Sequence, residues 1–379
     1  MKKFVVFLLL VIFCISGCGE IELNNAAIPI AFGIDSKDNR IFVSVQIAKP
    51  VSPGTSAGNA PQFFVITASG QTFSEASRNI SLFFASIPLW SQVQVSLLSD
   101  TKAQQGVDDL VDLLVRNRFV RKTNTLVVTK NATPEQILTI NPYLESYTGV
   151  AIRKLLQSQE KQLGIYIHTD IEEFLQKLSA PGVEPTIPLI TIQKNGREKQ
   201  LLLDGTAVFK DTKMIGSLNE TESRGYSLIN PKTKTIGLFL IPSPVDPEHK
   251  VTLEISYSQT KVTPVINGQN IKMNIEINLD GNFYEQSGTE NLFTPEIFKM
   301  IENGAEQELK RQMTLSIKKA KSLNSDIFGW GNLVYHKDPE VWKQVEDDWD
   351  QLFPEIPYAI KVNFELRRSY LTDKSFIFR

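Results

Sequence analysis

The residue whose surroundings most clearly predict chemistry is Cys18. It follows Ser16 and Gly17, which close an apolar run over residues 4–15 behind a positively charged start. This order of basic, apolar and small residues is typical of an exported precursor. Small residues before the cysteine fit the extended cleavage site of a signal peptidase, and the thiol can form a thioether with a diacylglyceryl group. We therefore predict a mature protein that begins with an N-palmitoyl, S-diacylglycerol Cys18.

Two other interpretations of this segment are open. An ordinary signal peptide could contain Cys18 by chance, and the apolar run could remain uncleaved as a membrane anchor. The run is shorter than the about 20 residues that a bilayer-spanning helix needs, which disfavours the anchor. In each case residues 19–379 lie outside the cytoplasm. Because Cys14 belongs to the predicted signal peptide 1–17 and Cys18 carries lipid, the mature chain keeps no thiol for a disulfide, a metal or a nucleophile.

Histidines and acidic residues are the next candidates for chemistry. His168 and Asp170 could bind a metal or act as an acid–base pair, but His249 and His336 belong to other predicted elements. Metal sites gather several ligands, so a structural role for His168 at a helix start is favoured. The group Asp347-Asp348-Asp350 could bind a cation. Its position near the end of a predicted helix favours an exposed helical face instead.

Gly329-Trp330-Gly331 has two glycines spaced as in a dinucleotide fingerprint, without the preceding strand or the acidic residue that the fingerprint requires. A tight turn is the favoured interpretation. Trp330 in such a turn is a candidate contact with a partner protein, because exposed aromatic residues are enriched at interfaces. Trp342 and Trp349 are expected in the core. Gly54-Thr55-Ser56-Ala57-Gly58 matches the GxSxG pattern, but it lies in a Pro/Gly/Ser-rich loop between two predicted strands and lacks the strand-to-helix turn of a nucleophile elbow. We predict no catalytic residue, no metal site and no cofactor.

The composition is that of an ordinary globular protein. The chain has 379 residues, 42% hydrophobic and 22% charged, which is enough for two or three domains. Removing Lys2 and Lys3 from the 40 basic residues leaves 38 against 42 acidic ones. Such a chain offers no basic stripe to release counterions from phosphates, which excludes a nucleic-acid partner.

The N-terminal half alternates strands with helices. A period of two predicts a hairpin at residues 26–34 and 41–48, followed by a Pro/Gly/Ser-rich loop at 50–61. Capping signals and apolar stripes predict helices between the later strands. The predicted strands are 63–68, 93–98 and 125–129, and the predicted helices are 73–84, 104–118, a short one from Thr133, 150–159 and 170–178. The proline-rich run 181–188 is the predicted domain boundary.

The C-terminal half has the pattern of an antiparallel sheet. Strict alternation at 251–257, 262–266 and 271–279, with Asn267-Gly268 as a hairpin turn, predicts a meander with one buried face. Apolar residues at every fourth position predict a helix over 295–323 that is about 40 Å long. Strands are also expected at 201–209, 235–240 and 358–367, and a second helix from Asp338.

These patterns predict an α+β, multidomain protein with mixed and antiparallel sheets and packed helices. The expected N-terminal domain spans 18–190 and is α+β. The expected C-terminal domain spans 200–379 and is a β-meander covered by the long helix.

A series of motifs follows Cys18 along nearly the whole mature chain. They are Glu22-Leu23-Asn24, Gly33-Ile34-Asp35, Val43-Ser44-Val45-Gln46-Ile47, Gly205-Thr206-Ala207-Val208-Phe209-Lys210, Ile215-Gly216, Glu222-Ser223-Arg224-Gly225, and Asp326-Ile327-Phe328-Gly329-Trp330-Gly331 with Trp342 and Trp349. In type and order, after a lipid-attachment cysteine, these motifs resemble those of the Ger(x)C family of spore-germination lipoproteins. The chain departs from the family at Gly19, where a tryptophan is usual, and at Arg368-Ser369-Tyr370, where a glycine often follows the arginine.

The resemblance implies a non-catalytic C subunit of a nutrient germinant receptor, required for receptor assembly or function. Such subunits are lipid-anchored on the outer face of the spore inner membrane and act with integral-membrane A and B subunits. Two other classes stay open. An extracytoplasmic solute-binding lipoprotein should show two α/β lobes with parallel sheets, and a cell-wall hydrolase should show a pair of catalytic groups.

Overall fold

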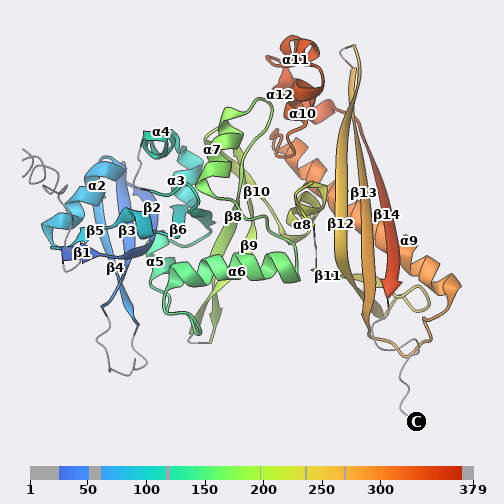
Figure 1. The fold of residues 1–379 in the computed structure, drawn as a ribbon, viewed down its shortest axis with the longest axis horizontal. Coiled ribbons are helices and arrows are strands. Elements are labelled where there is room, and N and C mark those ends of the chain that lie inside the picture. The colour runs from blue at the N-terminus through green and yellow to red at the C-terminus, as the bar shows by residue number, and fades with distance from the viewer. Residues whose placement is uncertain are drawn as a thin grey trace, which may run out of the picture.

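A computed structural model describes residues 25–50, 61–116, 120–196, 198–234, 237–268 and 270–368. The predicted signal peptide, Cys18 and most of the predicted loop at 50–61 lie outside these residues. Within the described ranges, no helix combines the length and the apolar character needed to cross a membrane. The predicted α+β class is confirmed, since two large sheets each carry packed helices (Figure 1).

An eight-stranded sheet organises the N-terminal and central parts of the chain. Its order is β10-β9-β8-β7-β6-β2-β3-β4. The series β2-β6-β7-β8 is parallel, and the other neighbours are antiparallel. The strands are β2 (Pro29–Lys37), β3 (Arg40–Ala48), β4 (Phe63–Gly70), β6 (Val95–Ser99), β7 (Thr125–Thr129), β8 (Thr186–Asn195), β9 (Glu198–Lys210) and β10 (Lys213–Leu218). A separate parallel pair joins β1 (Ala26–Ala27) to β5 (Ile87–Pro88).

Helices cover both faces of this sheet because its strands alternate apolar side chains between two cores. Phe32 and Ile34 contribute to one core and Ala31 to the other. The first face carries α2 (Phe73–Asn79), α3 (Asp100–Gln105), α4 (Asp108–Arg116) and α7 (Ile171–Ser179), and the second carries α5 (Pro134–Leu138) and α6 (Thr148–Gln162). The predicted hairpin of β2 and β3 is confirmed.

A four-stranded sheet forms the C-terminal part, in the order β11-β12-β13-β14. The meander β11-β12-β13 is antiparallel, as predicted, whereas β14 is parallel to β13. The strands are β11 (Gly237–Pro242), β12 (Lys250–Asn267), β13 (Asn270–Gln286) and β14 (Tyr358–Arg368). The helices of this part are α8 (Glu220–Ile229), α9 (Pro295–Ser322), α10 (Trp330–Lys337), α11 (Pro339–Val345) and α12 (Trp349–Leu352).

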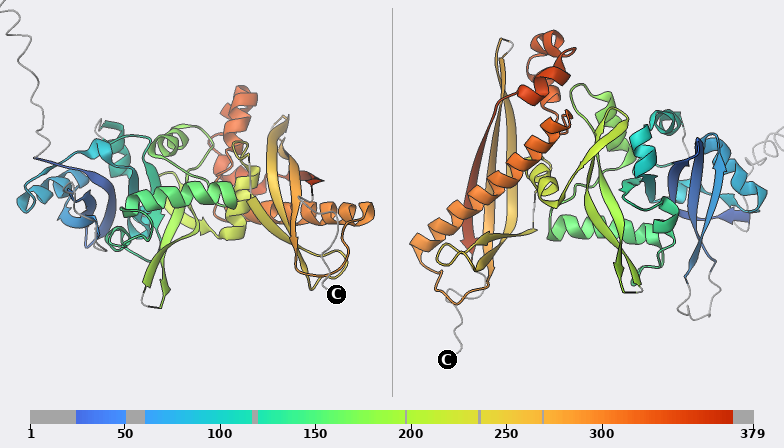
Figure 2. Two further views of the ribbon diagram at one scale, coloured as in Figure 1. Left: turned by 60° about the horizontal axis from the view of Figure 1, so that its bottom comes forward. Right: turned by 180° about the vertical axis from the view of Figure 1, so that it is seen from behind.

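The long helix α9 crosses the four-stranded sheet, as the right view of Figure 2 shows. Thr294 accepts a hydrogen bond from the amide of Ile297 and caps the helix, and Pro295 occupies its first turn. The stripe from Ile301 to Ile317 is buried. At about 1.5 Å per residue the helix is roughly 42 Å long, which confirms the predicted covering of the meander.

Three predicted elements were wrong in detail. The predicted helix over 104–118 is two helices, because Gly106 adopts a φ of 112° that a continuing α-helix does not allow. The runs 251–257 and 262–266 are one strand, β12, in which the pairing register shifts between Ile255 and Tyr257. This shift exposes Tyr257, which strict alternation would have buried.

The predicted boundary at 181–188 does not separate two sheets. β8 begins inside this run and pairs with β9, so hydrogen bonding continues from residue 186 to residue 218. Pro185 and Pro188 are buried. An exposed linker therefore does not occupy this position.

Candidate functional site

His168 and its neighbours form no cluster of potential ligands. Its Nε2 lies 2.9 Å from Thr125 Oγ1. Asp170 caps α7 by accepting a hydrogen bond from the amide of Glu173 at 2.8 Å. In the part of the chain that the structure describes, no group of three or more His, Cys, Asp and Glu side chains could hold a metal ion. His168 thus lies just before a helix start, against a threonine of β7.

Trp330 is fully buried, so the expectation of an exposed partner contact at this residue was wrong. Its ring stacks on Phe328 with centroids 5.6 Å apart and contacts Phe353 edge-on at 5.6 Å. Gly329 precedes it with a φ of 67°, which confirms the predicted tight turn. The left-handed glycine turns the chain inward and starts α10 at Trp330, so the ring enters the core instead of pointing to solvent.

The turn is held by Asp326, a buried carboxylate. Its Oδ1 accepts a hydrogen bond from the amide of Trp330 at 3.0 Å, and its Oδ2 accepts from the amide of Gly331 at 2.8 Å and the indole of Trp349 at 3.2 Å. Burial raises the pKa of Asp326 to about 7, against the opposing effect of these three donors. One side chain therefore fixes the start of α10 and the position of Trp349.

Part of the run predicted as a domain boundary packs against this turn. The carbonyl of Gly182 accepts a hydrogen bond from the amide of Asn332 at 3.1 Å, and the amide of Glu184 donates to the carbonyl of Asp326 at 2.9 Å. A Cβ added to Gly182 would lie 2.5 Å from the Cα of Gly331. The two backbones can approach this closely only because neither Gly182 nor Gly331 carries a Cβ. We call the contact of residues 181–184 with residues 326–332 the junction.

Ionic groups surround a cavity of about 250 Å³ beside the junction. Lys210 Nζ lies 3.0 Å from Glu184 Oε1 and also pairs with Asp350. Burial alone would lower the pKa of Lys210, but these two carboxylates raise it above its ordinary value. Asp347 and Asp348 are exposed in the connection between α11 and α12, and Asp350 lies in α12. Of these three aspartates, Asp350 therefore forms an ion pair that connects α12 to β9.

Helix α8 joins the central strands to α9. Asn219 and Glu222 form its capping box. Arg224 donates to the carbonyl of Leu238 at 2.6 Å, and the hydroxyls of Ser223 and Thr206 lie 2.9 Å apart. A Cβ on Gly225 would lie 2.1 Å from the carbonyl oxygen of Gln312 in α9. The motif around Glu222 and Gly225 is thus a packing contact between two helices.

Replacing Gly225 by alanine is expected to lower the free energy of unfolding by roughly 1–3 kcal/mol, because a backbone carbonyl cannot move aside as a flexible side chain can. Urea unfolding of the purified protein measures this change. Gly304→Ala is the matched control, since the nearest atom to its added Cβ is Ile241 Cδ1 at 3.4 Å. Alanine favours a helix interior, so the control should be neutral or stabilising. Equal destabilisation of both variants would contradict the close contact of α8 with α9.

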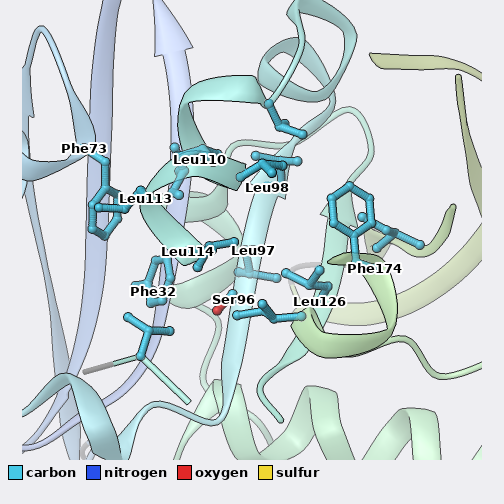
Figure 3. A pocket seen from close by; sticks show the side chains of 16 residues that line it. Phe32, Phe73, Ser96, Leu97, Leu98, Leu110, Leu113, Leu114, Leu126 and Phe174 are labelled. Atoms are coloured by element: carbon cyan, nitrogen blue, oxygen red, sulfur yellow. The ribbon is translucent and has the colours of Figure 1, made fainter. Parts of the chain in front are cut away.

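A second cavity, drawn in Figure 3, lies inside the N-terminal core. The side chains that line it come from β2, β6, β7, β8, α2, α4, α7 and two connecting segments, and they are apolar except for Ser96. They include Phe32, Phe73, Leu97, Leu98, Leu110, Leu113, Leu114 and Phe174 (Figure 3). Its volume is about 50 Å³, far below the roughly 300–1,000 Å³ of a ligand pocket. It is a packing gap of the core.

The sequence contained one signal of this site that was not used, and one residue of the site without a signal. Asn219 and Glu222 have the spacing of a capping box and would have predicted α8. Asp326, four residues before a tryptophan between two glycines, has no comparable local pattern. Its role depends on Trp349, which is 23 residues away in the chain.

Comparison with known proteins identifies the two halves of the chain. Residues 19–192 match the family described as spore germination protein N-terminal domain. Residues 204–370 match the family described as spore germination B3/GerAC like, C-terminal. Together the two matches cover nearly all of the chain after residue 18.

Curated relatives match over almost their full length. The chain is 26% identical to spore germination protein KC of Bacillus subtilis (strain 168), over 97% of this chain and 95% of that protein. It is 24% identical to spore germination protein B3 of the same organism, over 96% of each chain. The crystal structure of the GerBC protein has the same fold, with a TM-score of 0.55, 18% identity and coverage of 88% of this chain and 96% of that one. The chain therefore belongs to the Ger(x)C family of spore germination proteins.

Proposed function

We propose that the protein is a lipid-anchored, non-catalytic C subunit of a spore nutrient germinant receptor. It is held on the outer face of the spore inner membrane and takes part in the assembly or function of the receptor during germination. Its partners are the integral-membrane A and B subunits. The observation that carries the proposal is the match of both halves, over almost the full length of proteins that are named spore germination proteins.

The position of the family-like motifs supports a scaffold. Glu222 to Gly225 and Asp326 to Gly331 hold helices and backbone segments together at α8 and at the junction. Their hydrogen bonds are made within the protein. A residue set of this kind suits a rigid surface for partner contacts better than a reaction centre.

The sequence around Cys18 supports the anchor. A single acyl chain gives only marginal membrane binding, whereas two or more chains hold a protein stably. A diacylglyceryl group together with an N-palmitoyl chain therefore keeps the mature protein at the membrane. The solute-binding alternative requires two α/β lobes with parallel sheets, and the mainly antiparallel C-terminal sheet does not have this form.

The test is co-purification from detergent-solubilised inner membranes of spores that carry tagged wild-type protein, Cys18→Ala or Cys14→Ala. We expect the wild type and Cys14→Ala to remain in the membrane fraction and to recover the A and B subunits, because Cys14 is lost with the signal peptide. Cys18→Ala should leave the membrane fraction. The proposal fails if the wild type purifies without A and B subunits and nutrient germination proceeds normally without the gene.

A further inference from the structure

An exposed apolar surface lies at the end of the molecule where the described chain begins. Four side chains form it: Ile28 is 43% exposed, Leu82 81%, Phe83 60% and Ile87 51%. Leu82 ends the short 3-10 helix η2 (Ile80–Leu82), Phe83 directly follows it, and Ile87 lies in β5. We call these four residues the N-terminal patch. β1 and β5 lie at the far end of the molecule from the four-stranded sheet (Figure 1).

Strand pairing places Ile87 of the patch beside the start of the described chain. Ala26 is the partner of Ile87 in the parallel pair of β1 and β5, and the amide of Leu89 donates to the carbonyl of Ala27 at 3.0 Å. Ile28 directly follows β1, two residues after the partner of Ile87. Leu82 precedes Ile87 by only five residues.

We propose that the N-terminal patch inserts into the interfacial region of the lipid bilayer and orients the anchored protein. This proposal rests on the lipid anchor of the proposed function. Ala26 lies eight positions after Cys18, and a segment of this length reaches at most about 28 Å even when fully extended. Because Ala26 pairs directly with Ile87, the anchor keeps the patch within that distance of the membrane surface.

The residues around the patch keep the free-energy cost of inserting it into lipid low. Residues 79–99 contain no charged residue, so contact with lipid requires no charge of this segment to leave water. Two basic residues lie close to the patch. Exposed Arg78 precedes it in the chain. Lys49 is next to Ala48, and the amide of Ala48 donates a hydrogen bond to the carbonyl of Ile28. Both cations suit anionic headgroups. Glu20 and Glu22 oppose that attraction, so apolar contact is the main source of binding.

The test uses the lipidated, full-length mature protein in vesicles of phosphatidylcholine and phosphatidylglycerol. Cys18 carries the lipid, so Ser81→Cys adds the single free thiol for an environment-sensitive fluorophore. Ser256→Cys places the same probe on β12 as the control position. We expect the probe at position 81 to shift its emission to the blue and to be quenched by lipids that carry a nitroxide near the headgroup. The probe at position 256 should show neither change.

Variants identify the residues responsible. The double variant Leu82→Ser/Phe83→Ser should lose most of the quenching at position 81. Leu144→Ser, at a leucine that is 95% exposed outside the patch, should keep it. Because all three side chains are exposed, circular dichroism and thermal unfolding should match the unsubstituted protein.

Two outcomes separate the proposal from the function on which it rests. The protein could float with the vesicles while the probe at position 81 reports surroundings as polar as those at position 256. This result refutes insertion of the patch into the membrane and favours a protein partner for this surface. If the protein does not float at all, the lipid anchor itself fails. Equal quenching in the double variant and in Leu144→Ser also refutes the role of the patch.

Discussion

Trp330→Ala is expected to lower the free energy of unfolding by about 3–5 kcal/mol, the usual cost of truncating a buried tryptophan. The ring contacts Phe328, Phe353 and Tyr358, with centroids within 6.1 Å, and Lys321 Nζ lies 6.0 Å from its centre. Removing it opens a cavity where α9, α10 and β14 meet. Guanidinium unfolding, with the slope compared between variants, measures the loss.

Trp330→Phe is the matched control for this variant. It keeps most of the ring and removes an indole N–H that has no hydrogen-bond partner among the described residues. Since no hydrogen bond is lost, Trp330→Phe should cost much less than Trp330→Ala. A small effect of Trp330→Ala would contradict the burial of the ring and would support the exposed partner contact that the sequence suggests for this residue.

Asp326 is expected to make the protein less stable as the pH rises from about 4 to about 7. Burial raises the pKa of its carboxyl to about 7 in the folded protein, whereas an unfolded aspartate titrates near pH 3.9. Between these values the folded state retains a proton that the unfolded state releases. The stability that the protonated Asp326 contributes is thus fully present below about pH 4. It is lost as the pH rises through about 7, and the free energy of unfolding falls by at most roughly 4 kcal/mol in total.

The measurement is the free energy of unfolding across this pH range for the wild type and Asp326→Asn. The variant cannot titrate, so its pH dependence should be smaller, whatever its stability at any one pH. Burial also raises the pKa of Glu184 in the same direction, and Glu184→Gln separates that part. An unchanged pH profile in Asp326→Asn would show that the three donors keep the carboxylate ionised throughout.

Elements with long, regular patterns could be predicted from the sequence. The buried face of α9 repeats every fourth residue from Ile301 to Ile317, and Thr294 and Pro295 define its start. β7 was predicted at the residues where it occurs, Thr125–Thr129. In these segments the local sequence pattern and the tertiary packing require the same side chains. The packing could therefore be predicted from the pattern.

The junction could not be predicted in the same way. Proline and glycine in the run 181–188 suggest a domain boundary, but Gly182 allows a close contact of its backbone with that of Gly331. Trp330 between two glycines suggests an exposed turn, and its burial follows from hydrogen bonds of Asp326 and from α9, α10 and β14 together. Such contacts join residues that are far apart in sequence, and the periodicity of apolar residues within one segment does not predict them.

The parallel pairing of β14 with β13 has a consequence for the order of folding. Asn278 and Asn363 are hydrogen-bonded neighbours although 85 residues separate them in the chain. Ile360 and Phe364 of β14 belong to the same core as Ile301 and Leu309 of α9. Contacts over such separations form late, after a large loss of chain entropy. The C-terminal core therefore closes only when the last strand is available to pair with β13, and until then the apolar faces of α9 and the meander remain open to chaperones and proteases.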